Sequence, residues 1–173
     1  MRITKLQAAR NHLRTACALW FADTDPISVH TLAYAAHEVI HRIYRSEGNT
    51  DLLYDTTVIK DEFRNDFAKT LKKSANFFKH ADRETKANDS TEFNPELNEL
   101  LLMTSITGLQ RLGQKLEPSE SALLFWLYLH HPAWFPQHPA TGRIPAHHIT
   151  AMREAPRPEF FKAYIAVKKS KSK

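Results

Sequence analysis

One segment decides the fold: Asp25–Arg45, which reads DPISVHTLAYAAHEVIHRIYR. It opens on a helix start signal, because an Asp side chain can cap a first turn and proline fits the first helical position. The segment predicts a helix to about Arg45 that stops before Gly48 and contacts neighbouring helices on two sides. One face of that helix is aliphatic and consists of Leu32, Ala36, Val39 and Ile43.

The rest of the chain also shows helical rather than alternating periodicity. Apolar spacing, the start signal Asn94-Pro95 and Pro118 predict four more main helices, near residues 4–22, 56–72, 95–114 and 118–130. A short last helix is expected at 159–167. The sequence therefore predicts an all-α fold. We expect an up-and-down bundle of about five main helices over residues 1–130, and a proline- and histidine-rich C-terminal extension over 131–173. The extension should pack on the bundle within one domain and end in a disordered basic tail.

Composition and charge narrow the class of protein. The single cysteine, Cys17, excludes an internal disulfide and suits a reducing cytoplasm, which is the expected location. The net charge is +5, but four of these charges belong to lysines in the last six residues. The remaining chain therefore has no general basic excess. No membrane span is expected, because prolines and histidines interrupt the uncharged stretch 121–142.

The pentapeptide HEVIH, His37–His41, matches the zinc-hydrolase pattern. Two histidines one turn apart can bind one zinc ion while Glu38 acts as the base on a bound water. A catalytic zinc also needs a third protein ligand, and His80 and Glu62 are the candidates on other segments. We expect no metal and no cofactor. A metal-dependent hydrolase that uses His37, His41 and Glu38 is an alternative.

The segment Lys72–Arg83 carries a second set of reactive side chains around Phe77 and Phe78, a pair that we expect to anchor the segment to the core. His80 can exchange a proton near neutral pH, Asn76 can hold an oxygen, and Lys79 can offset phosphate charge. This combination suits RNA cleavage without a metal, with the 2′-hydroxyl as nucleophile. The competing interpretation is an ordinary helix end, where cations complement the helix dipole and Asn and Asp form turns.

The order of elements resembles the HEPN superfamily of helical bundles. Its members often have an alanine-rich second helix, similar to residues 30–41, and a later helix that carries arginine and then, four to six residues on, histidine. Residues 76–82, NFFKHAD, resemble the end of that motif, but the arginine is absent and Lys73 stands seven residues before His80. The resemblance implies RNA cleavage by a dimer, or RNA binding alone in degenerate members, within a bacterial stress or defence system.

Three functions therefore remain open. The first is a HEPN-like RNA-binding protein or metal-independent ribonuclease, with His80, Asn76 and Lys79 at its site. The second is a protein-interaction module without chemistry, and the third is the metal-dependent hydrolase. We also expect a homodimer, because consecutive Leu100, Leu101 and Leu102 should not all be able to face one core.

Overall fold

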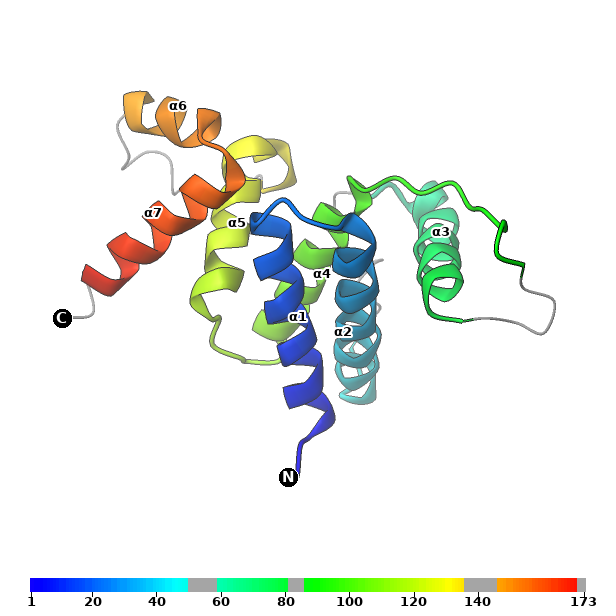
Figure 1. The fold of residues 1–173 in the computed structure, drawn as a ribbon. Helices are drawn as coiled ribbons and strands as arrows, with labels where there is room; N and C mark the ends of the chain where they lie inside the picture. Colours follow the sequence, from blue (N-terminus) through cyan, green and yellow to red (C-terminus); the bar gives the residue numbers. More distant parts are fainter. Residues whose placement is uncertain (50–58, 81–85, 136–145, 171–173) are drawn as a thin grey trace.

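A computed structural model describes residues 1–49, 59–80, 86–135 and 146–170. These residues contain no strand, which confirms the all-α prediction, and their arrangement is compatible with a helical bundle (Figure 1). None of the described helices has both the length and the apolarity that crossing a membrane requires. The helices are α1 Lys5–Phe21, α2 Pro26–Ser46, α3 Asp61–Lys79, α4 Leu97–Arg111, α5 Pro118–His130, α6 Ala146–Glu154 and α7 Arg157–Ser170, with one 3-10 turn, η1 Pro132–Trp134.

Local capping chemistry sets where these helices begin. Asp25 accepts hydrogen bonds from the backbone N–H groups of Ile27 and Ser28, both at 3.0 Å, so the predicted start of α2 is confirmed. The Ser28 hydroxyl and these two N–H groups stabilise the carboxylate and lower the pKa of Asp25. Pro118 occupies the first turn of α5, and that helix has the predicted bounds.

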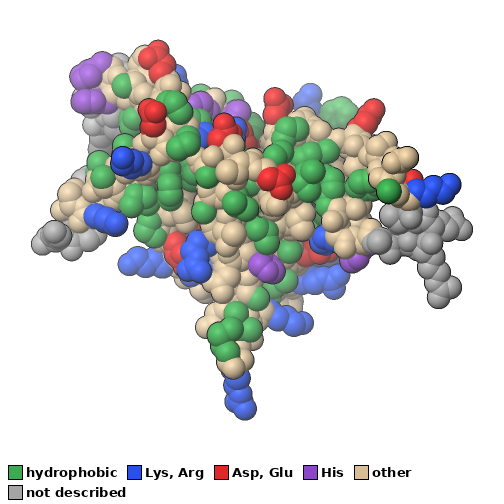
Figure 2. All heavy atoms as spheres, in the orientation of Figure 1, with side chains coloured by type: hydrophobic (Ala, Val, Ile, Leu, Met, Phe, Trp, Pro, Cys, Tyr) green, Lys and Arg blue, Asp and Glu red, His purple; other side chains and the backbone are tan. Residues whose placement is uncertain are grey.

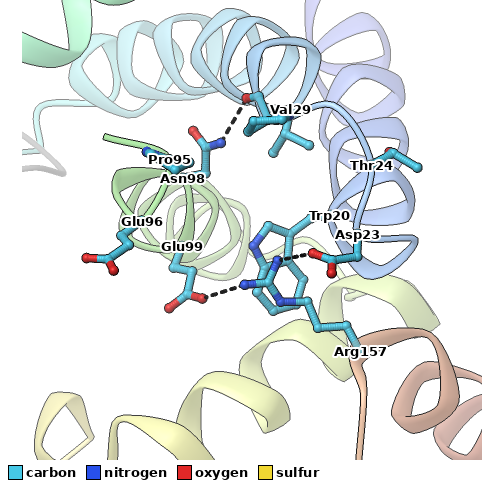
Figure 3. A pocket seen from close by; sticks show the side chains of 10 residues that line it. Trp20, Asp23, Thr24, Val29, Pro95, Glu96, Asn98, Glu99 and Arg157 are labelled. Carbon is cyan, nitrogen blue, oxygen red and sulfur yellow. Dashed lines mark hydrogen bonds and ion pairs between the residues drawn. The ribbon is translucent and has the colours of Figure 1, made fainter. Parts of the chain in front are cut away.

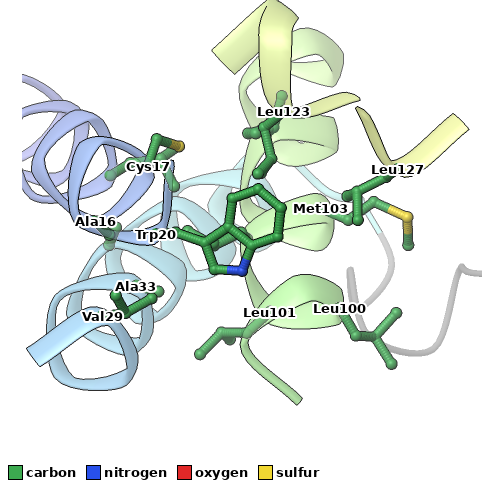
Figure 4. Close-up of a cluster of buried hydrophobic side chains, with 14 of the residues drawn as sticks. Ala16, Cys17, Trp20, Val29, Ala33, Leu100, Leu101, Met103, Leu123 and Leu127 are labelled. Atoms are coloured by element: carbon green, nitrogen blue, oxygen red, sulfur yellow. The ribbon is translucent and has the colours of Figure 1, made fainter. Parts of the chain in front are cut away.

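The core lies where α1, α2, α4 and α5 meet. Trp20 of α1 is almost fully buried in it, among leucines of α4 and α5 (Figure 4). Cys17 is fully buried beside it, and this burial raises the pKa of the thiol. The cysteine is therefore a small core residue, as its apolar neighbours in the sequence indicate.

Helix α4 corrects one premise of the sequence analysis. Leu100, Leu101, Leu102 and Met103 are all buried within the single chain. This is possible because α4 is enclosed by α1, α2 and α5, so apolar side chains are accommodated around most of its circumference. The run of leucines therefore provides no support for a homodimer, which stays a prediction from the family resemblance.

Helix α3 lies at one side of the bundle, beyond α2 (Figure 1). Both of its ends differ from the predicted range 56–72, because Ile59 and Lys60 are not helical, the helix begins at Asp61, and it continues without a break to Lys79. Residues 56–58 of that range lie outside the described residues. The buried residues Leu71 and Ala75 face α2, which is the main packing partner of α3. The opposite face of α3 is exposed to solvent.

The C-terminal part contains more helix than predicted. Helix α6 falls partly within a segment that was expected to be irregular, and α7 is longer than the predicted range 159–167. Lys168 and Lys169, expected in a disordered tail, belong to α7, whereas residues 171–173 lie outside the described part. Helix α4 is shorter than the predicted range 95–114, because Gly113 adopts a left-handed conformation (φ 68°) after Leu112 caps it.

Candidate functional site

The end of α3 carries the three residues that the sequence analysis singled out. Asn76 lies in the last turn, and the backbone N–H of His80 donates to its carbonyl oxygen at 2.9 Å. His80 itself caps the helix with an extended backbone (φ −118°, ψ 133°). Both residues are exposed, so their polar groups are accessible to a ligand.

Lys79 points in a different direction from these two residues. Its Nζ lies 4.0 Å from Oε2 of Glu38 and 5.2 Å from the centre of the Tyr34 ring, both on α2. Burial raises the pKa of Tyr34 to about 12, and the charge of Glu38 adds to the increase. The structure therefore places Lys79 against α2, where it helps to dock α3, and leaves Asn76 and His80 at the exposed end.

A row of basic residues precedes them on the same helix. Lys72 and Lys73 lie three and four residues after Lys69, and Asn76 lies four and three residues after them, so the four residues share one side of α3. We call this row the lysine stripe. All four residues are exposed, on the side of α3 opposite Leu71 and the other residues that pack on α2. The stripe spans about 10.5 Å along the helix axis, and His80 follows it as the residue that caps the helix.

The C-terminal half of α3, residues 67–79, carries charge of one sign only. All the acidic residues of α3 lie in its first six positions, whereas residues 67–79 contain four lysines and no Asp or Glu. The face of the molecule drawn in Figure 2 mixes both signs. Lys69 pairs with Asp66 at 3.4 Å, an exposed contact that contributes little. The lysine stripe is therefore a local basic patch on a protein of mixed surface charge.

His30 of α2 connects three helices from the interior. Asn98 of α4 donates from its side-chain amide to the carbonyl oxygen of Pro26 (3.0 Å), which turns its Oδ1 toward the ring. His30 Nδ1 then donates to that Oδ1 at 2.9 Å, while Nε2 lies 3.2 Å from the carbonyl oxygen of Leu71 on α3. The ring is fully buried, with Phe78 and Phe93 edge-on to it. This histidine has a structural role.

The two histidines of HEVIH lie side by side on α2, with ring centres 5.7 Å apart. His37 is 4% exposed, and its Nδ1 has no hydrogen-bond partner among the described residues. Burial lowers the pKa of His37 to about 3, and the neighbouring His41 adds to the decrease. Glu38 points toward Lys79 instead. The expected third ligands do not join the pair, because no cluster of three or more His, Cys, Asp or Glu side chains suited to a metal occurs in the described part.

We predict that the protein, purified without a histidine tag, carries no stoichiometric transition metal. The physical reason is that no described residue joins the pair as a third ligand, since two histidines alone bind zinc weakly compared with a complete site. Elemental analysis of the purified chain checks this. About one zinc per chain, lost in both His37→Ala and His41→Ala, would contradict it and favour the hydrolase.

A pocket of about 310 Å³ lies where α1, α2 and α4 meet the start of α7 (Figure 3). The guanidinium group of Arg157 covers the Trp20 ring at 4.1 Å and pairs with Asp23 at 3.0 Å and Glu99 at 3.5 Å. Glu99 also lies 2.7 Å from His131 Nε2. These contacts hold α7 against the bundle. The sequence analysis did not identify them, because the residues are up to 134 positions apart and share no motif.

Comparisons with family models, curated proteins and solved structures give no match to this chain. The site is therefore interpreted from its own geometry. The lysine stripe and the exposed end of α3 form the one place in the described residues where the candidate RNA-cleaving side chains and a local basic patch coincide.

Proposed function

We propose that the protein binds RNA through the exposed face of α3, from Lys69 to His80, in the manner of a HEPN-like helical bundle. The observation that carries the proposal is the lysine stripe, which concentrates exposed positive charge on one side of a helix whose C-terminal half has no acidic residue. Lysines that neutralise phosphates supply most of the sequence-independent affinity for nucleic acid. Lys72 and Lys73, for which the described residues provide no ion-pair partner, are the strongest candidates for this contact.

The proposal also rests on the family resemblance, and residues 30–41 and 76–80, which carry it, lie among the described residues. The alanine-rich helix α2 packs against the helix that carries the NFFKH segment, and two of the contacts between them are polar. One is the approach of His30 to the Leu71 carbonyl oxygen, and the other is the Lys79–Glu38 pair. Small alanine side chains allow close approach of neighbouring helices. The two segments that carry the resemblance are therefore adjacent in space.

The same end of α3 has the groups for metal-independent cleavage. In this scheme the imidazole of His80 accepts the proton of the 2′-hydroxyl as its oxygen attacks the adjacent phosphorus. The 5′-oxygen leaves with a proton from water, so the products are a 2′,3′-cyclic phosphate and a 5′-hydroxyl end. Asn76 would hold a phosphate oxygen. Lys72 and Lys73 would offset the phosphate charge in place of Lys79, because Lys79 lies near Glu38.

We predict that the double change Lys72→Gln and Lys73→Gln weakens RNA binding by roughly tenfold at ~100 mM salt. The slope of log affinity against log salt should fall by about 1.4, because each lysine lost removes one phosphate contact on a single strand. Fluorescence anisotropy with a labelled oligonucleotide measures both quantities. The matched control is Lys168→Gln and Lys169→Gln on α7, which removes the same charge elsewhere. An equal loss in the control would place binding in the basic tail.

A cleavage assay distinguishes a ribonuclease from a protein that only binds RNA and from an interaction module. In His80→Ala, RNA binding should persist while any cleavage is lost, and gel analysis of labelled RNA without added metal follows both. Binding without cleavage in the wild type would indicate a degenerate, RNA-binding member of the proposed class. A wild-type chain that neither binds nor cleaves RNA would contradict the proposal and favour the interaction module.

A further inference from the structure

We propose that the site on α3 recognises single-stranded rather than double-stranded RNA, with Phe77 as a stacking platform for a base. This inference rests on the proposed function and specifies its substrate class. Phe77 is 42% exposed, with only the neighbouring Phe78 ring edge-on to it among the described aromatic side chains. Its position relative to the lysine stripe gives the exposed ring a use.

Helical geometry places the ring beside the charges of the stripe. Phe77 lies four residues after Lys73, so the two side chains are neighbours on the helix surface with Cβ atoms ~5–6 Å apart. His80 follows three residues later, just beyond the last helical residue, with an extended backbone. The ring is held in part by Phe78, whose ring centre is 6.1 Å away in an edge-on arrangement. The ring therefore lies next to a cation of the lysine stripe, and the proposed proton acceptor follows it closely in the sequence.

This combination matches what single strands require. Proteins that bind single strands without sequence preference commonly combine two features. A row of positive charges follows the sugar-phosphate backbone of the nucleic acid, and an aromatic side chain stacks on a base. In a duplex the base faces are already stacked on each other, so an exposed phenylalanine gains nothing from them. A base stacked on Phe77 would also bring its ribose and phosphate toward Lys73 and His80.

Phe63 provides an internal comparison on the same helix. It is 57% exposed, more than Phe77, but it lies in the first turn among Asp61, Glu62 and Asp66. Negative charge there repels a phosphate backbone. Phe63 is separated from Phe77 by 14 residues, about 21 Å along the axis, so one short strand is not expected to use both rings at once.

The test compares a single-stranded RNA of about 12 nucleotides with the same sequence in a duplex, by anisotropy at fixed salt. Wild-type protein should bind the single strand at least tenfold more tightly. Phe77→Leu should lose about tenfold for the single strand, because leucine remains apolar but offers no ring, and should change duplex binding little. Phe77→Tyr, which keeps the ring, should bind as the wild type does. Phe63→Leu should also have no effect.

The outcomes separate the two proposals. Equal affinity for single strand and duplex, or unchanged binding in Phe77→Leu, would overturn the inference while the effect of Lys72→Gln and Lys73→Gln still supports the function. Loss of binding in Phe77→Tyr as well as Phe77→Leu would also overturn it, because the ring would then not be the determinant. Absence of any RNA binding by the wild type would overturn both.

Discussion

Replacing His30 by alanine should lower the free energy of unfolding by about 3 kcal/mol. The side chain is fully buried, so its removal leaves a cavity at the junction of α2, α3 and α4. It also leaves Asn98 Oδ1 without its donor in a site closed to water, and an unsatisfied buried acceptor costs about 1–3 kcal/mol. The loss should be greatest for α3, because that helix packs mainly on α2.

Chemical denaturation measures the total effect, and amide hydrogen exchange locates it. Exchange should accelerate along α3 more than along α1, which packs against α2 independently of this ring. His12→Ala is the matched control, because that histidine is exposed on α1 and its loss should change stability by no more than about 0.5 kcal/mol. A loss below about 1 kcal/mol in His30→Ala would contradict the structural role assigned to the ring.

His37 should make the protein less stable as the pH falls from 7 to 5. Its pKa is about 3 in the folded chain, below the ordinary histidine value near 6.5 that applies when the chain unfolds. The stability that comes from keeping His37 neutral is therefore complete above pH ~6.5 and is lost progressively as the pH falls toward 3. Between pH 7 and 5 the unfolded chain gains nearly one more proton than the folded chain, which amounts to about 2 kcal/mol.

Denaturation curves at both pH values isolate this contribution when the wild type is compared with His37→Leu. The variant should lack about 2 kcal/mol of the acid-induced loss, and its stability at pH 7 should be close to that of the wild type, because leucine leaves no buried nitrogen without a partner. The exposed histidine variant His12→Leu should retain the full pH dependence. An identical pH dependence in His37→Leu would show that His37 titrates normally in the folded state.

The sequence predicted the helices where a local signal was strong. The caps at Asp25 and Pro118 fix helix starts through contacts within a single turn, so both positions could be read from the chain. The end of α3 was missed although Leu71, Ala75 and Phe78 continue the helical spacing, because the lysines and Asn76 between them fit a turn as well as a helix. The enclosure of α4 by three other helices could not be predicted either. Its run of leucines was therefore expected to exceed what one core could bury.

The residue types of the candidate site could be predicted from the sequence, but the directions of their side chains could not. The residue types of NFFKH indicated their chemistry, but the direction of Lys79 toward Glu38 depends on how two helices pack. The burial of His37 likewise depends on tertiary contacts that HEVIH does not encode. The exposure of Phe77 was the opposite case, since a phenylalanine pair was expected to anchor the segment and one member is turned to solvent.

The central claim is that RNA contacts the exposed face of α3. Two-dimensional ¹H–¹⁵N NMR of the labelled full chain, titrated with a short single-stranded RNA, tests it most directly. The account predicts that shift changes concentrate on amides from Lys69 to His80, are reduced in the Lys72→Gln and Lys73→Gln variant, and leave α5 and α7 unchanged. Shift changes confined to α7, or none at saturating RNA, would contradict it.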